Sequence, residues 1–274
     1  MTFAERLAGV VADTGPLCLG IDPHPALLEG WGLPDDAAGV REFGLRAVDA
    51  AHGGVGIVKP QVAFFERHGS AGFGALEEVM ATARRAGLVV IADAKRGDIG
   101  STAEGYADAW LRPGSPLEAD AVTASPYLGV DALDPLLRRA AAEGKGVFVL
   151  AATSNPEAVG LQTARRGDGV PVARDVVDQL RRWTSAHGAH GAAGVVLGAT
   201  LRLADYGIDP GSLGPLPILA PGFGTQGARL DRIAELFGAA APQVIASVSR
   251  SVLSAGAAGV ADALAAARAQ VRAA

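Results

Sequence analysis

The stretch Leu88-Val-Val-Ile-Ala-Asp-Ala-Lys-Arg-Gly-Asp98 joins a short apolar run directly to a charged segment. Residues 88–93 show no polar alternation, which is typical of a parallel strand covered on both faces. The run ends in Asp93, and Lys95 and Asp98 follow within five residues. Folds built on parallel strands place their functional groups at this end of each strand. The stretch therefore predicts both a strand and a functional strand end, and the same pattern recurs along the chain.

Eight such apolar runs occur, separated by longer, Ala-rich amphipathic stretches. The runs cover residues 16–22, 54–59, 88–93, 121–124, 146–151, 194–197, 216–220 and 243–247. Helices are predicted at 40–51, 71–86, 101–110, 131–143, 171–187, 230–236 and 260–272, and a loop at 201–215. Eightfold alternation of strand and helix predicts an α/β fold, a (β/α)8 or TIM barrel, as one domain over residues 1–274. A doubly wound sheet is the alternative, but no Gly-x-Gly-x-x-Gly follows the first strand.

The composition limits the classes of function. The chain has 274 residues, 49% of them hydrophobic and 19% charged, with a net charge of −5. No basic stripe for nucleic acid is expected, although local cations still permit an anionic small substrate. The single cysteine, Cys18, allows no internal disulfide or zinc site and is expected to be buried. No signal-peptide pattern and no run of about 18–20 apolar residues occurs, so no membrane association and a cytoplasmic location are expected.

Charged side chains gather at the ends of the second and third runs. Lys59 ends the second run, and Asp93 and Lys95 share one face if the segment is extended. Alternating charges hold one another ionised, and such a set can face a substrate carboxylate and deliver a proton. Taken alone, Asp-x-Lys-x-x-Asp is explained equally well by a structural ion-pair network. Lys59 at the neighbouring strand end, together with loops at residues 221–227 and Arg250 that could bind phosphate, favours a catalytic role.

The last two strand ends predict a phosphate site. Residues 221–227 form a Gly-rich turn after the seventh run, and Arg250 follows the eighth. In barrels, phosphate is commonly bound by these two loops, and arginine offers a planar fork of donors. Ser125 and Asn155 fit two roles equally, hydrogen bonding to a base edge or ordering loops and helix ends. The histidines show no metal-ligand spacing, and Ser154 has no recognisable His and acid partners.

Several motifs together resemble the orotidine 5′-phosphate decarboxylase family, in its type 2 branch, which is common in actinobacteria. They lie at residues 19–25, 59–65, 93–102, 123–129, 149–156 and 220–227. The resemblance implies a (β/α)8 barrel that works as a homodimer without metal or organic cofactor. It also implies a cytoplasmic lyase that converts orotidine 5′-phosphate to UMP and carbon dioxide, the last step of de novo pyrimidine biosynthesis.

The resemblance also assigns the catalytic residues. Lys95 is expected to protonate the pyrimidine carbon that loses carbon dioxide, and Asp93 to lie against the substrate carboxylate. Lys59 is expected to complete the charge network and reach the ribose. Asp98 is expected to enter the active site of the partner subunit, with Thr102 nearby.

The remaining assignments concern substrate binding. The resemblance implies that Asp22 holds the ribose hydroxyls and that Ser125 contacts the pyrimidine. Gln226 and Arg250 are expected to hold the phosphate. Asn155 is included with them as a substrate-binding residue. Binding energy from the remote phosphate is expected to help close loops over the substrate.

Two alternative functions are also considered, one with the same fold and one with the same phosphate site. A related sugar-phosphate decarboxylase group carries Asp-x-Lys-x-x-Asp but uses magnesium, which needs a second oxygen ligand near Asp93. A cation at Lys59 opposes such a metal. A non-catalytic nucleotide-binding protein would keep the phosphate loop but would not need the charged set of Lys59, Asp93, Lys95 and Asp98.

Overall fold

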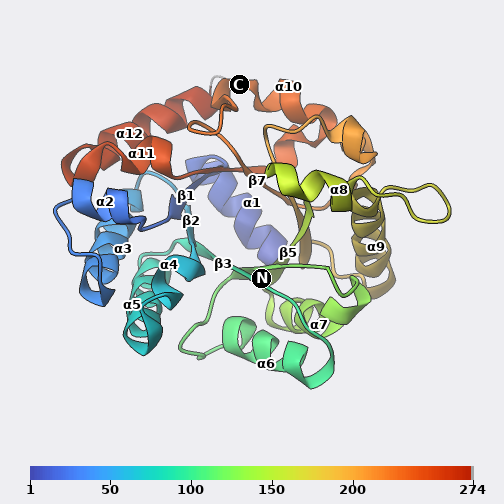
Figure 1. The fold of residues 1–274 in the computed structure, drawn as a ribbon, viewed down its shortest axis with the longest axis horizontal. Helices are drawn as coiled ribbons and strands as arrows, with labels where there is room; N and C mark the ends of the chain where they lie inside the picture. Colours follow the sequence, from blue (N-terminus) through green and yellow to red (C-terminus); the bar gives the residue numbers. More distant parts are fainter. Residues whose placement is uncertain (273–274) are drawn as a thin grey trace.

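Eight parallel strands close into a barrel in the computed structural model, which describes residues 1–272. The strands follow one another around the barrel in sequence order, and β8 pairs with β1 to close it (Figure 1). Their bounds are β1 (Leu17–Ile21), β2 (Ile57–Pro60), β3 (Val89–Arg96), β4 (Ala121–Ala124), β5 (Gly146–Ala152), β6 (Ala193–Leu197), β7 (Ile218–Pro221) and β8 (Val244–Val248). The predicted (β/α)8 barrel is therefore confirmed, and the doubly wound alternative is wrong.

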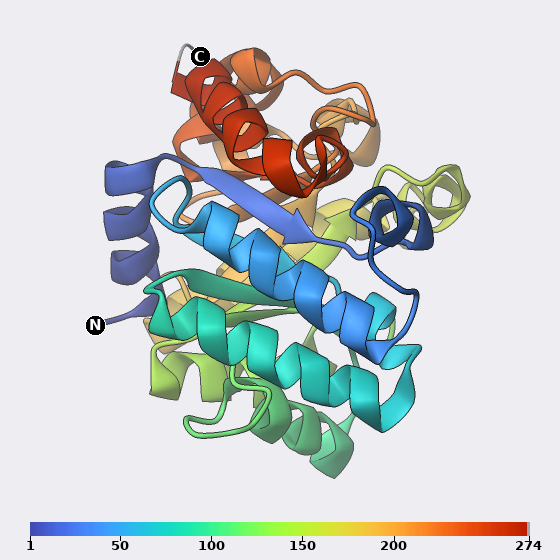
Figure 2. The same cartoon turned by 90° about the vertical axis from the view of Figure 1, so that its left-hand side faces the viewer.

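Helices cover the outside of the barrel, and Figure 2 shows α3 and α5 packed side by side there. The α-helices are α1 (Phe3–Thr14), α2 (Pro25–Gly30), α3 (Ala37–Ala51), α4 (Val62–Glu66), α5 (Gly69–Arg85), α6 (Gly100–Leu111), α7 (Asp134–Glu143), α8 (Val159–Gln162), α9 (Val172–His187), α10 (Ile233–Phe237), α11 (Arg250–Leu253) and α12 (Gly256–Arg272). None of the helices in residues 1–272 combines the length and the apolar character needed to cross a membrane.

The helices α1, α2, α4, α8 and α11 were not predicted from the sequence. Short 3-10 helices make up the other main differences from the predicted elements. They are η1 (Asp131–Leu133), η2 (Pro156–Ala158), η3 (Leu203–Tyr206), η4 (Pro210–Ser212), η5 (Leu230–Arg232) and η6 (Gly238–Gln243). The predicted loop at 201–215 contains η3 and η4. The helices predicted at 131–143 and 230–236 each begin with a 3-10 turn before continuing as α7 and α10. Single 3-10 turns lack a helical repeat long enough to show in the sequence.

Two separate apolar cores form around the strands. The larger one lies between the strands and the outer helices, and the smaller one fills the barrel interior. Residues of the smaller core include Cys18, Ile57, Ile91, Phe148 and Ile245. Successive side chains of a strand point to opposite faces, so each strand supplies both cores. Cys18 is fully buried here, as the sequence predicted.

The N-terminal helix α1, which the sequence prediction did not include, closes one end of this interior core. Thr2 and Glu5 form a reciprocal capping box that starts the helix. The Phe3 ring meets the Phe148 ring at 6.0 Å between centroids in an edge-on arrangement, and Arg6 pairs with Asp120 at 2.9 Å. Figure 1 shows α1 lying across the middle of the barrel. The other end of the barrel is left open for a ligand.

Substituting Phe3 with alanine tests this closure. Phe3 is 2% exposed, so Phe3→Ala should lower the free energy of unfolding by about 3–5 kcal/mol, through lost burial and the cavity left behind. Urea denaturation measures the change. Leu161→Ala, at a site 52% exposed, is the control and should change it by no more than about 0.5 kcal/mol. Equal effects of the two variants would contradict the closing role of α1.

Candidate active site

A cavity of about 410 Å³ lies at the carboxyl ends of the strands. Its polar lining comes from the ends of strands all around the barrel: Asp22 after β1, Lys59 in β2, Asp93 and Lys95 in β3, Thr123 in β4, Asn155 after β5, Gln226 after β7 and Arg250 after β8. This end of a barrel is where active sites form, because loops of every strand meet there. The cavity is therefore the candidate active site.

The two-residue period of the strands explains why the floor of this cavity is charged. Ile57 and Ile91 belong to the apolar interior, and Lys59 and Asp93 stand two residues further along the same faces. The polar layer thus lies directly above an apolar one. Little water can reach such groups from below, and their mutual electrostatic interactions are correspondingly strong.

Asp93 lies between two lysines. Its Oδ2 atom is 2.7 Å from Lys59 Nζ, and its Oδ1 atom is 2.6 Å from Lys95 Nζ. The side chains of Lys59 and Asp93 are 7% and 10% exposed, whereas that of Lys95 is 45% exposed and also reaches Gln61 Oε1 at 3.3 Å. Asp93 and Lys59 are therefore fixed in the floor, and the Lys95 ammonium is accessible to a ligand.

The cluster keeps its members charged. Burial alone would raise the pKa of Asp93, but the ammonium groups of Lys59 and Lys95 outweigh it and hold that pKa well below its usual range. Burial would likewise lower the pKa of Lys59, but the carboxylates of Asp93 and Asp22 raise it instead. Asp93 is thus an anion and Lys59 a cation at neutral pH, as the alternating charges predicted.

The backbone at Lys95 departs from the expected extended form. Lys95 has a φ of +49°, and the pairing of β3 with β4 shifts register between Ala92 and Arg96. The prediction that Asp93 and Lys95 point into the same cavity is confirmed, but the regular extended backbone from which it was derived is not present at Lys95. A left-handed residue at a bulge turns the Lys95 side chain back to Asp93.

Asp98, Thr102 and Ser125 do not line the cavity of their own chain. Asp98 lies between β3 and α6, half-buried, and its Oδ1 accepts a hydrogen bond from the Ile99 amide at 2.8 Å. Thr102 is exposed in α6, and Ser125 is half-buried just after β4. A single chain therefore brings together Lys59, Asp93 and Lys95, without Asp98.

Three further side chains in or beside the cavity were not assigned a role from the sequence. Thr123 Oγ1 donates to Asp93 Oδ1, and Gln61 contacts Lys95. Ser154 Oγ donates to Gln226 Oε1 at 3.1 Å, linking the loop after β5 to the loop after β7. All three lie beside predicted residues within motifs at the strand ends, which is the signal that would have found them.

The loop after β7 is a tight turn that packs against α11. Gly222 and Gly224 adopt φ values of +117° and +76°, and the Gly224 amide donates to the Ala228 carbonyl at 2.9 Å. A Cβ at position 224 would lie 2.4 Å from Ser251 Oγ, so the loop packs closely against α11. Glycine is therefore required for the loop to approach the helix that begins with Arg250.

The cavity is prepared for a polar, anionic ligand. Its lining holds more cations than carboxylates: Lys59, Lys95 and Arg250 against Asp22 and Asp93. Asp22 Oδ1 and Ser249 Oγ are buried without a hydrogen-bond partner among the described residues. Buried polar atoms of this kind are costly unless a ligand or water satisfies them. The arrangement suits a ligand with hydroxyls and a negative group.

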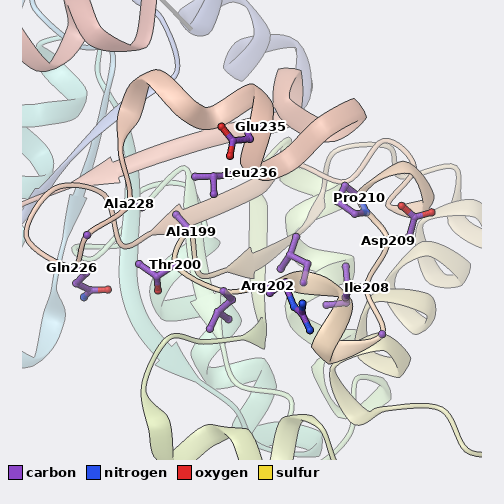
Figure 3. A pocket seen from close by; sticks show the side chains of 15 residues that line it. Ala199, Thr200, Arg202, Ile208, Asp209, Pro210, Gln226, Ala228, Glu235 and Leu236 are labelled. Carbon is purple, nitrogen blue, oxygen red and sulfur yellow. The ribbon is translucent and has the colours of Figure 1, made fainter.

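A second cavity, of about 970 Å³, adjoins the first at Gln226 (Figure 3). It lies between the segments that follow β6 and β7 and is lined largely by apolar side chains. Its charged residues are engaged on the protein itself, since Arg202 pairs with Asp205 and Glu235 with Arg232. This larger cavity lacks the lysine and carboxylate cluster, so the chemistry is assigned to the smaller one.

Comparison with known proteins gives a consistent result. The family model "Orotidine 5′-phosphate decarboxylase / HUMPS family" matches residues 15–266. Orotidine 5′-phosphate decarboxylases from Corynebacterium glutamicum and Salinispora tropica are each 50% identical, covering 93% of this chain and 92% and 91% of theirs. The crystal structure of a Streptomyces avermitilis homologue is 46% identical with a TM-score of 0.93, covering 99% of this chain and 95% of its own. The structure of Leishmania donovani OMP decarboxylase is 31% identical with a TM-score of 0.82, covering 100% and 98%.

The match extends over nearly the whole length of both partners in each comparison. The residues that carry the charge cluster, from β2 and β3, and the loop after β7 all lie inside the matched region. The chain belongs to the orotidine 5′-phosphate decarboxylase / HUMPS family.

Proposed function

We propose that this protein is a carboxy-lyase that converts orotidine 5′-phosphate to UMP and carbon dioxide in pyrimidine biosynthesis. The observation that carries the proposal is the Lys59–Asp93–Lys95 cluster, with Lys59 and Asp93 buried, at the floor of a cavity whose lining holds more cations than carboxylates. Family membership adds the substrate, since the relatives with 50% identity are named for this activity.

The cluster would supply the groups that act directly on the substrate carboxylate and on the reacting carbon. The Asp93 carboxylate, fixed by Lys59, would face the substrate carboxylate, and repulsion between the two anions is relieved when carbon dioxide leaves. The carbon–carboxylate bond breaks, and its electron pair stays on the pyrimidine carbon. The adjacent Lys95 ammonium stabilises that charge and then transfers a proton to the carbon.

Binding of the rest of the nucleotide is assigned to the cavity walls. Asp22 would hold ribose hydroxyls, with Lys59 also within reach of the ribose, and Gln226 and Arg250 would hold the phosphate. Asn155 lines the cavity and suits the pyrimidine. Ser125 remains a proposed pyrimidine contact, although the serines that line the cavity are Ser154, Ser247 and Ser249.

A homodimer would complete the site. Asp98 and Thr102 lie outside their own cavity. Ile99 follows Asp98, and Tyr127 and Leu128 belong to the loop after β4, which meets the end of β3 where the Ser125 amide donates to the Arg96 carbonyl; the three apolar side chains are 61%, 78% and 55% exposed. Such side chains are usually covered by another protein surface. We propose that this surface packs on a second copy of the chain and carries Asp98 into the partner's cavity.

The remaining elements of the proposal concern the protein as a whole. Residues 1–274 would act as one catalytic domain in the cytoplasm. The substrate would be a free nucleotide, with no nucleic acid or membrane involved. The reaction would need no metal or organic cofactor.

One rival, a magnesium-dependent sugar-phosphate decarboxylase, is disfavoured by the geometry around Asp93. Each Asp93 oxygen is in contact with a lysine ammonium, Oδ2 with Lys59 and Oδ1 with Lys95. A divalent cation would have to displace both or accept their repulsion. The other rival, a non-catalytic nucleotide-binding protein, gives no role to a lysine held beside a buried carboxylate.

The proposed proton donor is tested by Lys95→Ala. We expect kcat to fall by more than about 10³-fold, because no other ammonium is accessible at that position. The affinity for UMP, measured calorimetrically, should change little, since phosphate and ribose contacts remain. Arg202→Ala, in the second cavity, is the control and should retain wild-type kcat. Normal turnover by Lys95→Ala would show that the proton comes from another group.

The shared site is tested by mixing two inactive variants, Lys95→Ala and Asp98→Ala. A mixed dimer would contain one site with both defects and one site with neither. After subunit exchange at equal amounts, activity should recover to about a quarter of wild type, since half of the dimers are mixed and each has one intact site. In the control, a chain that carries both substitutions is mixed with the wild-type chain. Each site of a mixed dimer then has one defect, so subunit exchange creates no intact site. Failure of the two single variants to complement would place Asp98 in its own chain's site.

A further inference from the structure

The hydroxyl of Thr123 connects the two catalytic residues of β3. We infer that Thr123 is a positioning residue that aims the Lys95 ammonium and the Asp93 carboxylate at the reacting carbon. The inference rests on the proposed decarboxylation and adds a residue to it. It comes from β4, a strand to which no catalytic role has been assigned above.

The hydrogen bonds of Thr123 leave its hydroxyl only one orientation. Thr123 is 1% exposed, and its Oγ1 lies 2.9 Å from Asp93 Oδ1 and 2.9 Å from the Lys95 backbone nitrogen. An ionised carboxylate only accepts and an amide only donates, so the single hydroxyl hydrogen points to Asp93. A lone pair of Oγ1 accepts the Lys95 N–H. Thr123 therefore ties the side chain of one residue to the backbone of the other.

The first bond fixes the orientation of Asp93. Rotation of a carboxylate about its last bond is soft, so its plane is set by its partners. Lys59 holds Oδ2, while Thr123 and Lys95 share Oδ1. Lys95 is half exposed and must be free to approach the substrate, so Thr123 is the buried partner that keeps Oδ1 in place during the reaction. Without it, Asp93 can turn towards Lys59.

The second bond stabilises the bulge that carries Lys95. A left-handed lysine is strained by about 1–2 kcal/mol relative to an ordinary backbone form. The ladder between β3 and β4 is interrupted between Ala92 and Arg96, where the register shifts. The Lys95 amide finds its acceptor in the Thr123 side chain instead of a β4 carbonyl. Loss of this acceptor would leave a half-buried amide unpaired and favour a regular strand, which directs Lys95 elsewhere.

The effect should fall on the chemical step and spare binding. Phosphate and ribose contacts come from Arg250, Gln226 and Asp22, none of which hydrogen-bonds Thr123 in the described structure. A purely structural threonine would instead change stability and leave the kcat of the folded enzyme intact. The two roles are separated by comparing kcat, KM and the affinity for UMP with the melting temperature.

The experiment compares Thr123→Val, which keeps the shape but loses the hydroxyl, with Thr123→Ser, which keeps the hydroxyl. We expect kcat of Thr123→Val to fall about 10- to 100-fold, the usual cost of losing a group that orients a functional side chain. KM and UMP affinity should stay within about threefold of wild type, and Thr123→Ser should retain at least a third of wild-type kcat. Thr184→Val is the matched control, since Thr184 is 3% exposed and its Oγ1 has no partner in the described part of the chain. Its kcat should not change.

Two results would overturn the inference: wild-type kcat in folded Thr123→Val, or a kcat loss in Thr123→Ser equal to that in Thr123→Val. If Thr123→Val does not fold, Thr123→Cys replaces it, since a thiol is a weak donor and acceptor. Its kcat should then lie below that of Thr123→Ser, and equal values would count against the hydroxyl. Failure of the proposed function itself is distinguishable, because the wild-type protein would then show no turnover of orotidine 5′-phosphate.

Discussion

The Asp93 carboxylate, buried between two lysine ammonium groups, is the interaction on which the site depends. A lone buried carboxylate would take up a proton to avoid the cost of desolvation, and its pKa would rise. Lys59 and Lys95 reverse that outcome and keep Asp93 ionised. The barrel makes this possible because β2 and β3 are neighbours, and both Lys59 and Asp93 point into the barrel mouth above an apolar interior, where their side chains meet. The fold thus maintains a fixed negative charge where water is scarce.

The residues proposed to bind the phosphate and the residues proposed to react lie on different strands of the barrel. The loop after β7 and Arg250 lie on the side of the barrel formed by the last strands, whereas Lys59, Asp93 and Lys95 come from β2 and β3. Binding energy from a phosphate can therefore hold a nucleotide whose reacting carbon faces an unfavourable anion. Ser154 and Gln226 join the loops after β5 and β7 across the cavity. That contact connects the walls that a bound nucleotide would touch.

Much of this was predictable from the sequence, and the exceptions have physical causes. The apolar runs predicted the strands, and the polar residues at their ends pointed to Lys59, Asp93 and Lys95, because the carboxyl ends of all strands meet at one end of a barrel. The left-handed backbone of Lys95 leaves no mark in the sequence, since lysine rarely adopts it. In the sequence, Thr123 looks like an ordinary strand residue. Its role depends on the position of β4 beside the bulge of β3, which only the structure shows. The role proposed for Asp98 would depend on a second copy of the chain, which one sequence does not position.

Decarboxylation by the lysine and aspartate cluster, without a metal, is tested most directly by the turnover of orotidine 5′-phosphate by the purified wild-type protein with excess EDTA. Loss of substrate absorbance is followed, together with the UMP and carbon dioxide formed. We expect equal amounts of both products and a rate unaffected by the chelator, since lysines hold both oxygens of Asp93. A folded protein that leaves the substrate intact, or that turns it over only after magnesium is restored, would contradict it.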